Sequence, residues 1–493
     1  MYRHTKIVAT IGPATETAAL LEQLLLAGVD VFRLNFSHGE HEQKKAWIDA
    51  IRTLSARHKK AVSILGDLQG PKIRTGTMRQ GAVELVTGQP LIITTDNIEG
   101  TSERISTTYL DLPHDVEPHD RILLDDGHLE LEVQRVEGGQ VFCLVKQGGL
   151  LKDRKGINLP GVKVSTPAVT TKDYADLDFA IEQNLDWIAL SFVRTAEEVW
   201  KIKQYLFERQ SSIRVIAKIE KPEAVDNFEK ILEAADGIMV ARGDLGVELP
   251  SERVPLIQKK IIRLCNHHGK PVITATQMLE SMIGSPRPTR AETSDVANAI
   301  LDGTDAVMLS GETAAGQFPI ESVKVMARIA CDVEADQELN RDRFELVAPQ
   351  SVEQNIPDVI GQGACRLAEH VGAAAILAFT QTGSTATLVA KYRPALPVYA
   401  VTPTQQVRRH LALYRGVSSL RVAIQGDTEA QIASVEKAVL GSGLLKSGDV
   451  VVITMGSPVS APGTTNLLKI HRLGTGNFYE VHGSAYRATA VSN

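Results

Sequence analysis

The sequence is poor in the features that mark secreted, membrane and nucleic-acid-binding proteins. No two of its four cysteines form a C-x-x-C pair, so neither a zinc site nor a disulfide framework is indicated, and reduced thiols are expected. No apolar run is long enough to cross a membrane, and the six residues before the first apolar stretch leave no room for a signal peptide. A net charge of −6 without a long basic run argues against nucleic acid as a partner. The sequence therefore predicts a cytoplasmic protein that binds neither membranes nor nucleic acids.

What is present describes an ordinary globular protein of several domains. The chain has 493 residues, 43% of them hydrophobic and 23% charged. This length exceeds that of one compact unit, so two to four domains are expected.

Two apolar runs near the middle of the chain end in charged residues. The run at 215–219 leads to Lys218 and Glu220, and the run at 238–241 leads to Asp244. Between them, Pro222 to Ala235 has the length of one crossover helix. Ligands of parallel α/β folds bind at the C-terminal ends of strands, where two carboxylates can share Mg²⁺ and a lysine can attract an anion. An ordinary cluster of salt bridges at the rim of a barrel is the alternative.

The same rhythm of apolar strand and amphipathic helix extends on both sides of this unit. Strands are predicted at 6–12, 31–37, 61–68, 187–193, 214–220, 237–244, 271–277 and 306–312. Eight such strands predict a (β/α)₈ TIM barrel formed by residues 1–70 and 168–345.

Residues 71–167 follow a different pattern, with period two. Apolar residues alternate with polar ones on both sides of Gly138-Gly139, which is typical of a β-hairpin. No helix is expected here. The pattern predicts a small β-barrel lid domain, inserted into the barrel so that it overhangs the strand ends.

A C-terminal α/β domain is predicted for residues 346–480, with strands at 373–380, 397–402, 449–456 and 467–473. Its loop at 380–385 leads from a strand into a helix and suits a phosphate, although a plain capped helix explains it equally well. Residues 441–447 lack the glycine that a phosphate loop needs before its lysine, so they are interpreted as a helix end and a turn. Residues 481–493 form a tail without an interpretable pattern.

Nine segments complete the pattern: KIVATIGPAT, FRLNFSHG, GDLQGPKIRTG, KGINLPG, AKIEKPEA, MVARGDLGVE, ATQMLESM, SPRPTRAETSDVANA and MLSGETAAG. In order, in spacing and in the place of the inserted domain, the chain resembles the pyruvate kinase family over nearly its whole length. The resemblance implies a glycolytic enzyme that transfers the phosphoryl group of phosphoenolpyruvate to ADP and gives pyruvate and ATP. It also implies a homotetramer with a regulatory C-terminal domain.

The resemblance carries roles over to individual residues. Glu220 and Asp244 match the ligands of the divalent metal, Mg²⁺ or Mn²⁺. Lys218 and Arg33 match the residues that hold the phosphoryl group, Gly243 and Asp244 would offer N–H groups to the carboxylate of the substrate, and Thr276 is the candidate relay for protonation of the enolate. The residues matched to the nucleotide are Asn35, His38, Arg74 and Lys155.

One position departs from the commoner pattern of the family. Many members bind potassium through residues that match Asn35, Ser37, Asp67 and the carbonyl of Leu68, and they carry glutamate where this chain has Lys72. A lysine ammonium can replace a monovalent cation, and Leu68-Gln69 resembles the potassium-independent branch. We therefore expect that potassium is not required; the alternative is an exposed Lys72 with potassium bound as usual.

The regulatory loop departs as well. Thr382, Gly383, Ser384 and Thr385 match the loop that binds the phosphate of an effector, but the later loop at 456–463 has no arginine for a second phosphate. A sugar monophosphate or AMP is therefore expected rather than a bisphosphate.

Two other functions are compatible with the same residues. A Mg²⁺-dependent lyase or carboxylase of oxo-acid enolates would use the same pair of acids, and a metabolite sensor without activity would keep the fold. Lys218, Arg74 and the lid favour the kinase, because a lyase has no nucleotide to enclose.

Overall fold

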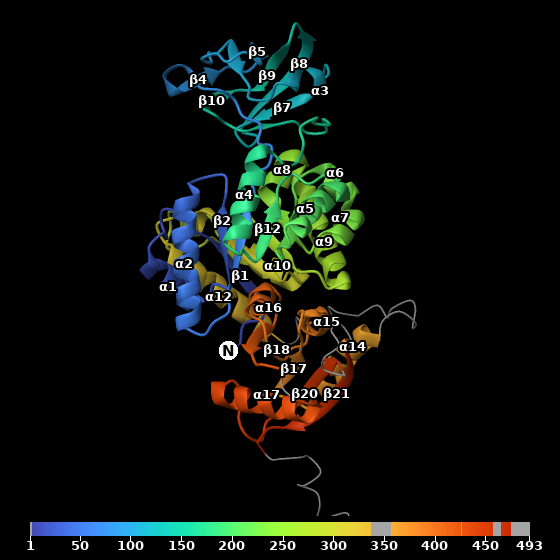
Figure 1. Ribbon diagram of the computed structural model, residues 1–493. Coiled ribbons are helices and arrows are strands. Elements are labelled where there is room, and N and C mark those ends of the chain that lie inside the picture. Colours follow the sequence, from blue (N-terminus) through green and yellow to red (C-terminus); the bar gives the residue numbers. More distant parts are fainter. Residues whose placement is uncertain (1, 337–355, 425, 457–464, 475–493) are drawn as a thin grey trace, which may run out of the picture.

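The computed structural model describes residues 2–336, 356–424, 426–456 and 465–474, and these ranges form three stacked domains. Figure 1 shows a β-rich domain at the top, a barrel ringed by helices in the middle and an α/β domain below. The lid and the C-terminal domain therefore lie at opposite ends of the barrel.

The middle domain is a closed barrel of eight parallel strands, as the sequence predicts. Neighbouring strands follow the order β1-β16-β15-β14-β13-β12-β3-β2. The strands are β1 (Lys6–Thr10), β2 (Val31–Asn35), β3 (Ser63–Asp67), β12 (Trp187–Leu190), β13 (Arg214–Ile219), β14 (Gly237–Ala241), β15 (Val272–Ala275) and β16 (Ala306–Leu309).

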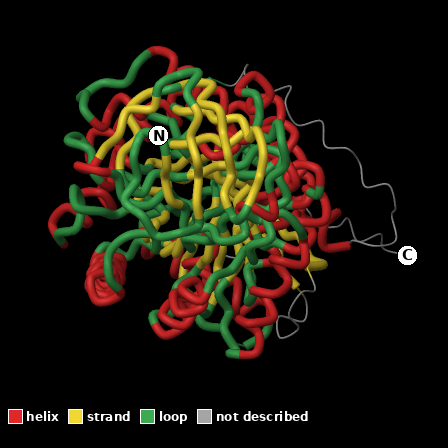
Figure 2. The backbone as a smooth tube through the Cα atoms, turned by 90° about the horizontal axis from the view of Figure 1, so that it is seen from above, coloured by secondary structure: helices red, strands yellow, loops and turns green. Residues whose placement is uncertain are grey.

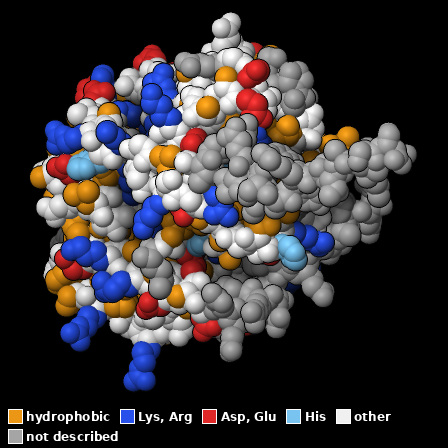
Figure 3. Space-filling model, turned by 90° about the horizontal axis from the view of Figure 1, so that it is seen from below, with side chains coloured by type: hydrophobic (Ala, Val, Ile, Leu, Met, Phe, Trp, Pro, Cys, Tyr) orange, Lys and Arg blue, Asp and Glu red, His pale blue; other side chains and the backbone are white. Residues whose placement is uncertain are grey.

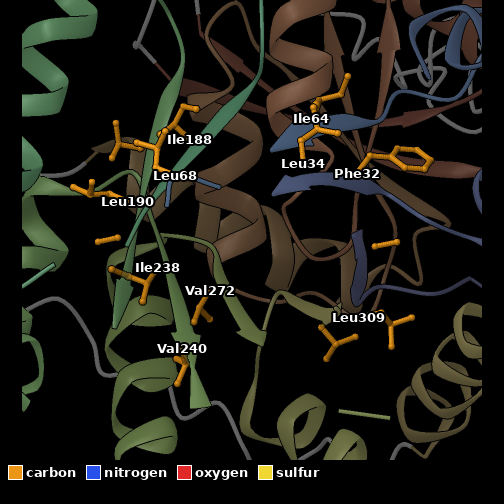
Figure 4. Packing of buried hydrophobic residues seen from close by; sticks show 14 of the residues in the cluster. Phe32, Leu34, Ile64, Leu68, Ile188, Leu190, Ile238, Val240, Val272 and Leu309 are labelled. Carbon is orange, nitrogen blue, oxygen red and sulfur yellow. The ribbon is translucent and has the colours of Figure 1, made fainter. Parts of the chain in front are cut away.

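Amphipathic helices cover the outside of this barrel. Outward-facing strand residues such as Phe32, Ile188 and Val240 are fully buried beneath them (Figure 4). The helices are α1 (Ala18–Ala27), α2 (His41–Arg57), α4 (Thr171–Glu182), α5 (Ala196–Glu208), α6 (Pro222–Asp226), α7 (Phe228–Ala234), α8 (Arg242–Glu248), α9 (Val254–His268), α10 (Arg290–Asp302), α11 (Gly311–Ala314) and α12 (Pro319–Ala335).

Two details of the barrel differ from the sequence-based expectation. The expected single helix from Pro222 to Ala235 is divided into α6 and α7 at Asn227, whose side-chain amide donates to the carbonyl of Arg194 at 3.0 Å. Asparagine competes for such local contacts and weakens a helix interior. The predicted strand at 237–244 ends at Ala241, and α8 begins at Arg242, so that Asp244 lies in the first turn of a helix.

The inserted domain is built mainly of antiparallel strands. A six-stranded sheet has the order β11-β7-β8-β9-β5-β6, and β10 pairs with β4. Gly138 and Gly139 both have positive φ in the β8–β9 turn, which confirms the predicted hairpin. The strands are β4 (Ala82–Leu85), β5 (Pro90–Thr94), β6 (Arg104–Ser106), β7 (Arg121–Leu124), β8 (Leu129–Glu137), β9 (Gln140–Gln147), β10 (Gly149–Lys152) and β11 (Ile157–Asn158).

The expectation that this domain contains no helix is wrong in two places: residues Arg79–Gly81 form a 3₁₀ turn, and α3 (Leu112–Asp115) forms one turn with Pro113 at its start. Seen from above, strands of the inserted domain lie in front of the barrel (Figure 2). The domain therefore overhangs the end of the barrel at which α8 begins.

The C-terminal domain is an open sheet of order β19-β18-β17-β20-β21, parallel except for β21. Its strands are β17 (Ala375–Phe379), β18 (Val398–Thr402), β19 (Val417–Arg421), β20 (Val450–Gly456) and β21 (Thr465–Arg472), and its helices are α14 (Ile356–His370), α15 (Ser384–Lys391), α16 (Gln405–Leu411) and α17 (Thr428–Ser442). The short edge strand β19 was not predicted, because two serines interrupt its apolar pattern. Helix α17 ends at Ser442 with Gly443 in the left-handed conformation, which confirms the helix end predicted at 441–447.

Charged side chains tie this domain to the lower end of the barrel. The ammonium of Lys6 donates to the carbonyl of Val417 at 2.8 Å, and Arg409 pairs with Asp186 at 2.7 Å. On the face seen from below, Lys and Arg side chains are interspersed with acidic and apolar ones (Figure 3). Within the described ranges no helix is long and apolar enough to span a bilayer.

Candidate active site

The C-terminal ends of the barrel strands surround one open pocket with about 710 Å³ of unfilled space. Residues from seven strands or the loops that follow them line it, among them Thr10, Arg33, Asn35, Asp67, Lys218, Asp244, Thr276 and Ser310. The barrel thus brings together side chains that are as far as 300 positions apart in the sequence.

A network of charges occupies the floor of this pocket. Asp67, of which 2% is exposed, accepts from the Nε of Arg33 at 2.6 Å and lies 3.3 Å from the ammonium of Lys218. Lys218 also contacts a carboxylate oxygen of Glu220 at 2.7 Å and donates to the hydroxyl of Ser191 at 2.8 Å. Two cations are therefore held side by side by two buried acids.

The pKa values reflect this mutual support. Burial alone lowers the pKa of Lys218, but the carboxylates of Asp67, Glu220 and Asp244 more than compensate and raise it above its ordinary value. Burial alone raises the pKa of Asp67, whereas Lys218 and Arg33 bring it below its ordinary value. Lys218 is therefore an ammonium and Asp67 a carboxylate at neutral pH.

Of the two acids proposed as metal ligands, Asp244 lines the pocket, and Glu220 is buried beside Lys218. Burial raises the pKa of Glu220, and repulsion from Asp244 adds to that effect, although Lys218 opposes it. A divalent cation between the two acids would relieve this repulsion, and carboxylates are the ligands that Mg²⁺ prefers. The acids fit Mg²⁺ only in part, because no group of three or more His, Cys, Asp or Glu side chains in the described part of the chain is arranged to hold a metal. Water and substrate oxygens would have to supply the other ligands.

Thr276 lies directly after β15 in an unusual conformation. Its φ is +68° and that of Gln277 is +54°, in a region that β-branched residues rarely adopt. The Thr276 hydroxyl accepts the N–H of Gly243 at 2.7 Å and donates to the carbonyl of Ala275 at 2.6 Å. Thr276 and the start of α8 are thus joined at the wall of the pocket, and the N–H of Gly243 is engaged with Thr276 in this structure.

The residues matched to the nucleotide lie where the barrel meets the lid. Arg74 and Gly156 form an antiparallel bridge, which places Lys155 beside Arg74, and Lys155 pairs with Asp125 of the lid at 2.7 Å. Burial lowers the pKa of His38, and the nearby charges of Arg74, Lys72, Lys44 and Arg33 lower it further. This region therefore carries a concentrated positive charge.

Strand pairing places Asn35 of β2 opposite Asp67 of β3, within the proposed monovalent-cation region. Asn35 accepts the N–H of Ser37 at 3.0 Å, and the carbonyl of Leu68 accepts the hydroxyl of Ser191 at 2.7 Å. Lys72 is exposed, and its ammonium makes no ion pair with any described residue. Lys72 is thus available to interact with a bound anion.

The candidate effector loop lies in the C-terminal domain, away from the pocket. Gly383, with a φ of +99°, precedes α15, and its N–H donates to the hydroxyl of Thr380 at 2.8 Å. The carbonyl of Thr382 accepts a bond of 3.3 Å from Arg214, the first residue of β13. The second loop of the prediction, at 456–463, falls outside the described residues except for Gly456, as does the tail at 481–493.

Sequence reasoning assigned no role to four residues of the site. Thr10 accepts from Arg33 at 2.9 Å, Ser191 links Lys218 to Leu68, and Arg242 donates to the carbonyl of Thr276. Glu248 joins the lid to the barrel by accepting from Asn158 at 3.0 Å and from Lys221 at 2.6 Å. The sequence signal that could have identified these four residues is their position at or just beyond the end of an apolar run, or in the helix that follows it.

A (β/α)₈ barrel with paired cations, paired acids and an overhanging lid is the arrangement that phosphoryl transfer needs, and it favours a phosphotransferase. Comparison with known proteins agrees. The model of the pyruvate kinase barrel domain matches residues 2–323, and that of the pyruvate kinase alpha/beta domain matches residues 358–471.

Individual relatives give the same result. The chain is 52% identical over 474 residues to a pyruvate kinase of Geobacillus stearothermophilus. The matched region covers 96% of this chain and 80% of the relative. It is 48% identical over 477 residues to a pyruvate kinase of Staphylococcus aureus (strain MRSA252), and the matched region covers 96% of this chain and 81% of that relative. A solved structure of a pyruvate kinase from Cryptosporidium parvum superposes with a TM-score of 0.87 at 41% identity, over 96% of both chains.

The chain belongs to the pyruvate kinase family. The expected fold and the expected phosphotransferase activity, that of a pyruvate kinase in glycolysis, are confirmed in preference to the lyase and the inactive sensor.

Proposed function

We propose that this pocket binds phosphoenolpyruvate with its phosphate between Arg33 and Lys218 and transfers the phosphoryl group to ADP. The observation that carries the proposal is the pairing of both cations with Asp67, at 2.6 and 3.3 Å. Two cations held by one buried acid are pre-organised, so they reach the oxygens of the phosphoryl group without a cost of reorganisation. Positioning and charge neutralisation are what phosphoryl transfer requires of a protein.

Glu220 and Asp244 are the proposed ligands of Mg²⁺ or Mn²⁺. Bound there, the ion would act as a Lewis acid that neutralises charge on the carboxylate and enol oxygens of the substrate. Because Lys218 already contacts Glu220 at 2.7 Å, its ammonium lies beside the place where the phosphoryl group travels. Asp244 lies in the first turn of the same short helix as Gly243, whose N–H would then turn from Thr276 to the substrate carboxylate.

The reaction breaks the bond between phosphorus and the enol oxygen and forms a bond from phosphorus to a β-phosphate oxygen of ADP. The enolate that remains takes a proton at its terminal carbon and becomes pyruvate. Thr276 is the proposed relay for that proton, directly or through water, because its hydroxyl lines the pocket next to Gly243. Replacing Thr276 by alanine should slow protonation while phosphate binding by Arg33 is retained.

Asn35, His38, Arg74 and Lys155 are the proposed contacts of the nucleotide phosphates. The positive charge that lowers the pKa of His38 also attracts the phosphates of ADP. Since Arg74 lies near the start of the inserted domain and Lys155 lies between its strands β10 and β11, movement of the lid would carry them toward the nucleotide.

We further propose that the enzyme works without potassium because Lys72 replaces that cation near Asn35, Ser37, Asp67 and Leu68. The exposed ammonium of Lys72 contributes to the same positive region as Arg74. A fixed ammonium and a bound monovalent ion supply the same charge to the phosphates.

The decisive experiment measures pyruvate formation from phosphoenolpyruvate and ADP with Mg²⁺ in buffer free of sodium and potassium, and again with potassium. Full activity without potassium is expected, and Lys72→Glu should make potassium an activator. Lys201→Glu, at an exposed lysine of α5, is the matched control and should stay independent of potassium. Activity only with potassium would refute the role of Lys72, and activity in neither buffer, even with AMP or a sugar phosphate, would refute the proposed mechanism.

For regulation we propose that Thr382, Gly383, Ser384 and Thr385 bind the phosphate of AMP or of a sugar monophosphate. Thr382 and Gly383 precede α15, and Ser384 and Thr385 form its first turn, where backbone N–H groups and the helix dipole attract phosphate. Ser384→Asp should abolish activation by AMP and by ribose 5-phosphate, whereas Ser447→Asp, at an exposed serine, should preserve it. Equal activation by fructose 1,6-bisphosphate and by monophosphates would contradict the preference for one phosphate.

The domain limits of 1–70 with 168–345, 71–167 and 346–480, the homotetramer and the cytoplasmic location stay predictions. Sedimentation of the purified chain tests the oligomeric state.

A further inference from the structure

The wall of the pocket contains a strained segment. Thr276 and Gln277 both adopt positive φ, +68° and +54°. Two consecutive residues other than glycine rarely hold this conformation, and threonine, branched at its β carbon, is among the least suited to it. Such a segment persists only where neighbouring groups hold it in place, and it is found most often at functional sites.

The side chain of Arg242 holds this segment. Its Nη2 atom donates to the carbonyl of Thr276 at 2.7 Å and lies 3.2 Å from the carbonyl of Gln277. Its Nη1 atom donates to Asp295 of α10 at 2.7 Å, which fixes the plane of the guanidinium. Because only 9% of Arg242 is exposed, water competes little for these bonds.

The same stretch of chain fixes the hydroxyl of Thr276 from the other side. Gly243, the residue after Arg242, donates its N–H to the Thr276 hydroxyl at 2.7 Å. The first two residues of α8 therefore contact Thr276 at its carbonyl and, until the substrate carboxylate takes the N–H of Gly243, at its hydroxyl. A β carbon at position 243 would lie only 3.3 Å from that hydroxyl oxygen, so the approach favours glycine.

We propose that Arg242 is a positioning residue for the protonation of the enolate, acting through Thr276. This rests on the proposed role of Thr276 as the proton relay. Arg242 itself faces the backbone and α10, and it is absent from the residues that line the pocket. Without the guanidinium, the segment relaxes toward negative φ and the hydroxyl turns away from the substrate.

The geometry also explains why arginine stands here rather than lysine. A planar guanidinium can serve two carbonyls with one nitrogen and a carboxylate with the other, whereas an ammonium is a single point of donation. Arg242→Lys should therefore recover only part of the function.

The experiment follows two reactions in Arg242→Gln, Thr276→Ala and the double variant. The first is turnover of phosphoenolpyruvate with ADP, and the second is exchange of the methyl hydrogens of pyruvate with D₂O, measured by NMR with Mg²⁺ and ATP. Arg242→Gln should slow the exchange about 10- to 100-fold, as expected for the loss of one charge-assisted bond. The KM for phosphoenolpyruvate should change less than about twofold, because the ligands of the phosphate are untouched.

The double variant separates positioning from a general structural role. If Arg242 acts through Thr276, adding Arg242→Gln to Thr276→Ala should slow the exchange no further. Equal losses in both backgrounds, or an Arg242→Gln enzyme with the exchange rate of the wild type, would overturn the proposal. If Thr276→Ala itself exchanges normally, the proposed role of Thr276 fails and the inference fails with it.

Arg52→Gln is the matched control for folding. Arg52 also donates to a backbone carbonyl, that of Asn184 at 3.1 Å, and to a carboxylate, that of Asp186 at 2.9 Å, but at the opposite end of the barrel. It should lose stability without losing the exchange reaction. If Arg242→Gln does not fold, Arg242→Lys is tested instead. Its exchange rate should lie between those of the wild type and Thr276→Ala, and an exchange rate equal to that of the wild type would refute the proposal.

Discussion

Replacement of Asp67 by asparagine removes the one carboxylate that both pocket cations share. The side chain is 2% exposed and bonds Arg33 at 2.6 Å and Lys218 at 3.3 Å. Asparagine keeps the shape but has no charge, and it presents one oxygen instead of two. Arg33 and Lys218 would then repel each other without a common counter-ion.

The magnitude follows from burial. Breaking a buried ion pair by removing one partner costs about 3–5 kcal/mol of folding free energy. Both cations keep another contact, Arg33 with Thr10 at 2.9 Å and Lys218 with Glu220 at 2.7 Å, so the lower end of that range is expected. A displacement of the two cations by about 1 Å should lower kcat/KM roughly 100-fold.

Urea unfolding followed by the fluorescence of the buried Trp187, together with pyruvate formation, checks both numbers. Asp49→Asn is the matched control, because Asp49 is 62% exposed and its pair with Lys45 contributes little. An Asp67→Asn enzyme within about threefold of wild-type kcat/KM and within about 1 kcal/mol of its stability would refute the reasoning.

The effect should also depend on pH. The pKa of Asp67 lies below its ordinary value of 3.8, so its contribution to stability is present above pH 3.8 and is lost as the pH falls through the folded-state pKa. The difference in stability between the wild type and Asp67→Asn should therefore be constant near neutrality and shrink in acid.

Three further predictions test other parts of the molecule. Lys218→Met should reduce turnover by at least about 1,000-fold while titration with Mn²⁺ still detects binding, because the acids remain; loss of binding would show that Lys218 organises the metal site. Asn158→Ala removes the bond of 3.0 Å to Glu248 and should raise the KM for ADP about three- to tenfold with little change for phosphoenolpyruvate, and equal changes in both would argue against a role in the lid. Burial lowers the pKa of Lys6 to about 8 from 10.5, so the unfolded chain binds more protons between these values and stability relative to Lys6→Met should rise with pH. The gain from pH 7 to 9.5 is about 2 kcal/mol in urea unfolding, and a difference that does not change with pH would contradict the lowered pKa of Lys6.

The regular parts of the fold were predictable because their signals are local. Eight apolar runs ending in polar residues predicted the barrel, and the hairpin pattern around Gly138-Gly139 indicated the change to antiparallel strands. Failures occurred where a tertiary contact decides the local structure. Asn227 divides a helix because its amide finds the carbonyl of Arg194, and β19 forms because a neighbouring strand supplies the partners that its own sequence does not suggest.

For the site, the sequence by itself determined which chemical groups are present and at which end of the barrel they gather. Strand ends place Arg33, Lys218 and Glu220 there whatever the details of packing. Only the tertiary structure decided how they are paired, since the bond from Asp67 to Lys218 joins residues that are 151 positions apart. It likewise decided that Arg242, a charged residue directly after a buried strand, bonds the carbonyl of Thr276, because a contact between the start of α8 and the residue after β15 depends on the closure of the barrel and leaves no periodic trace in the sequence.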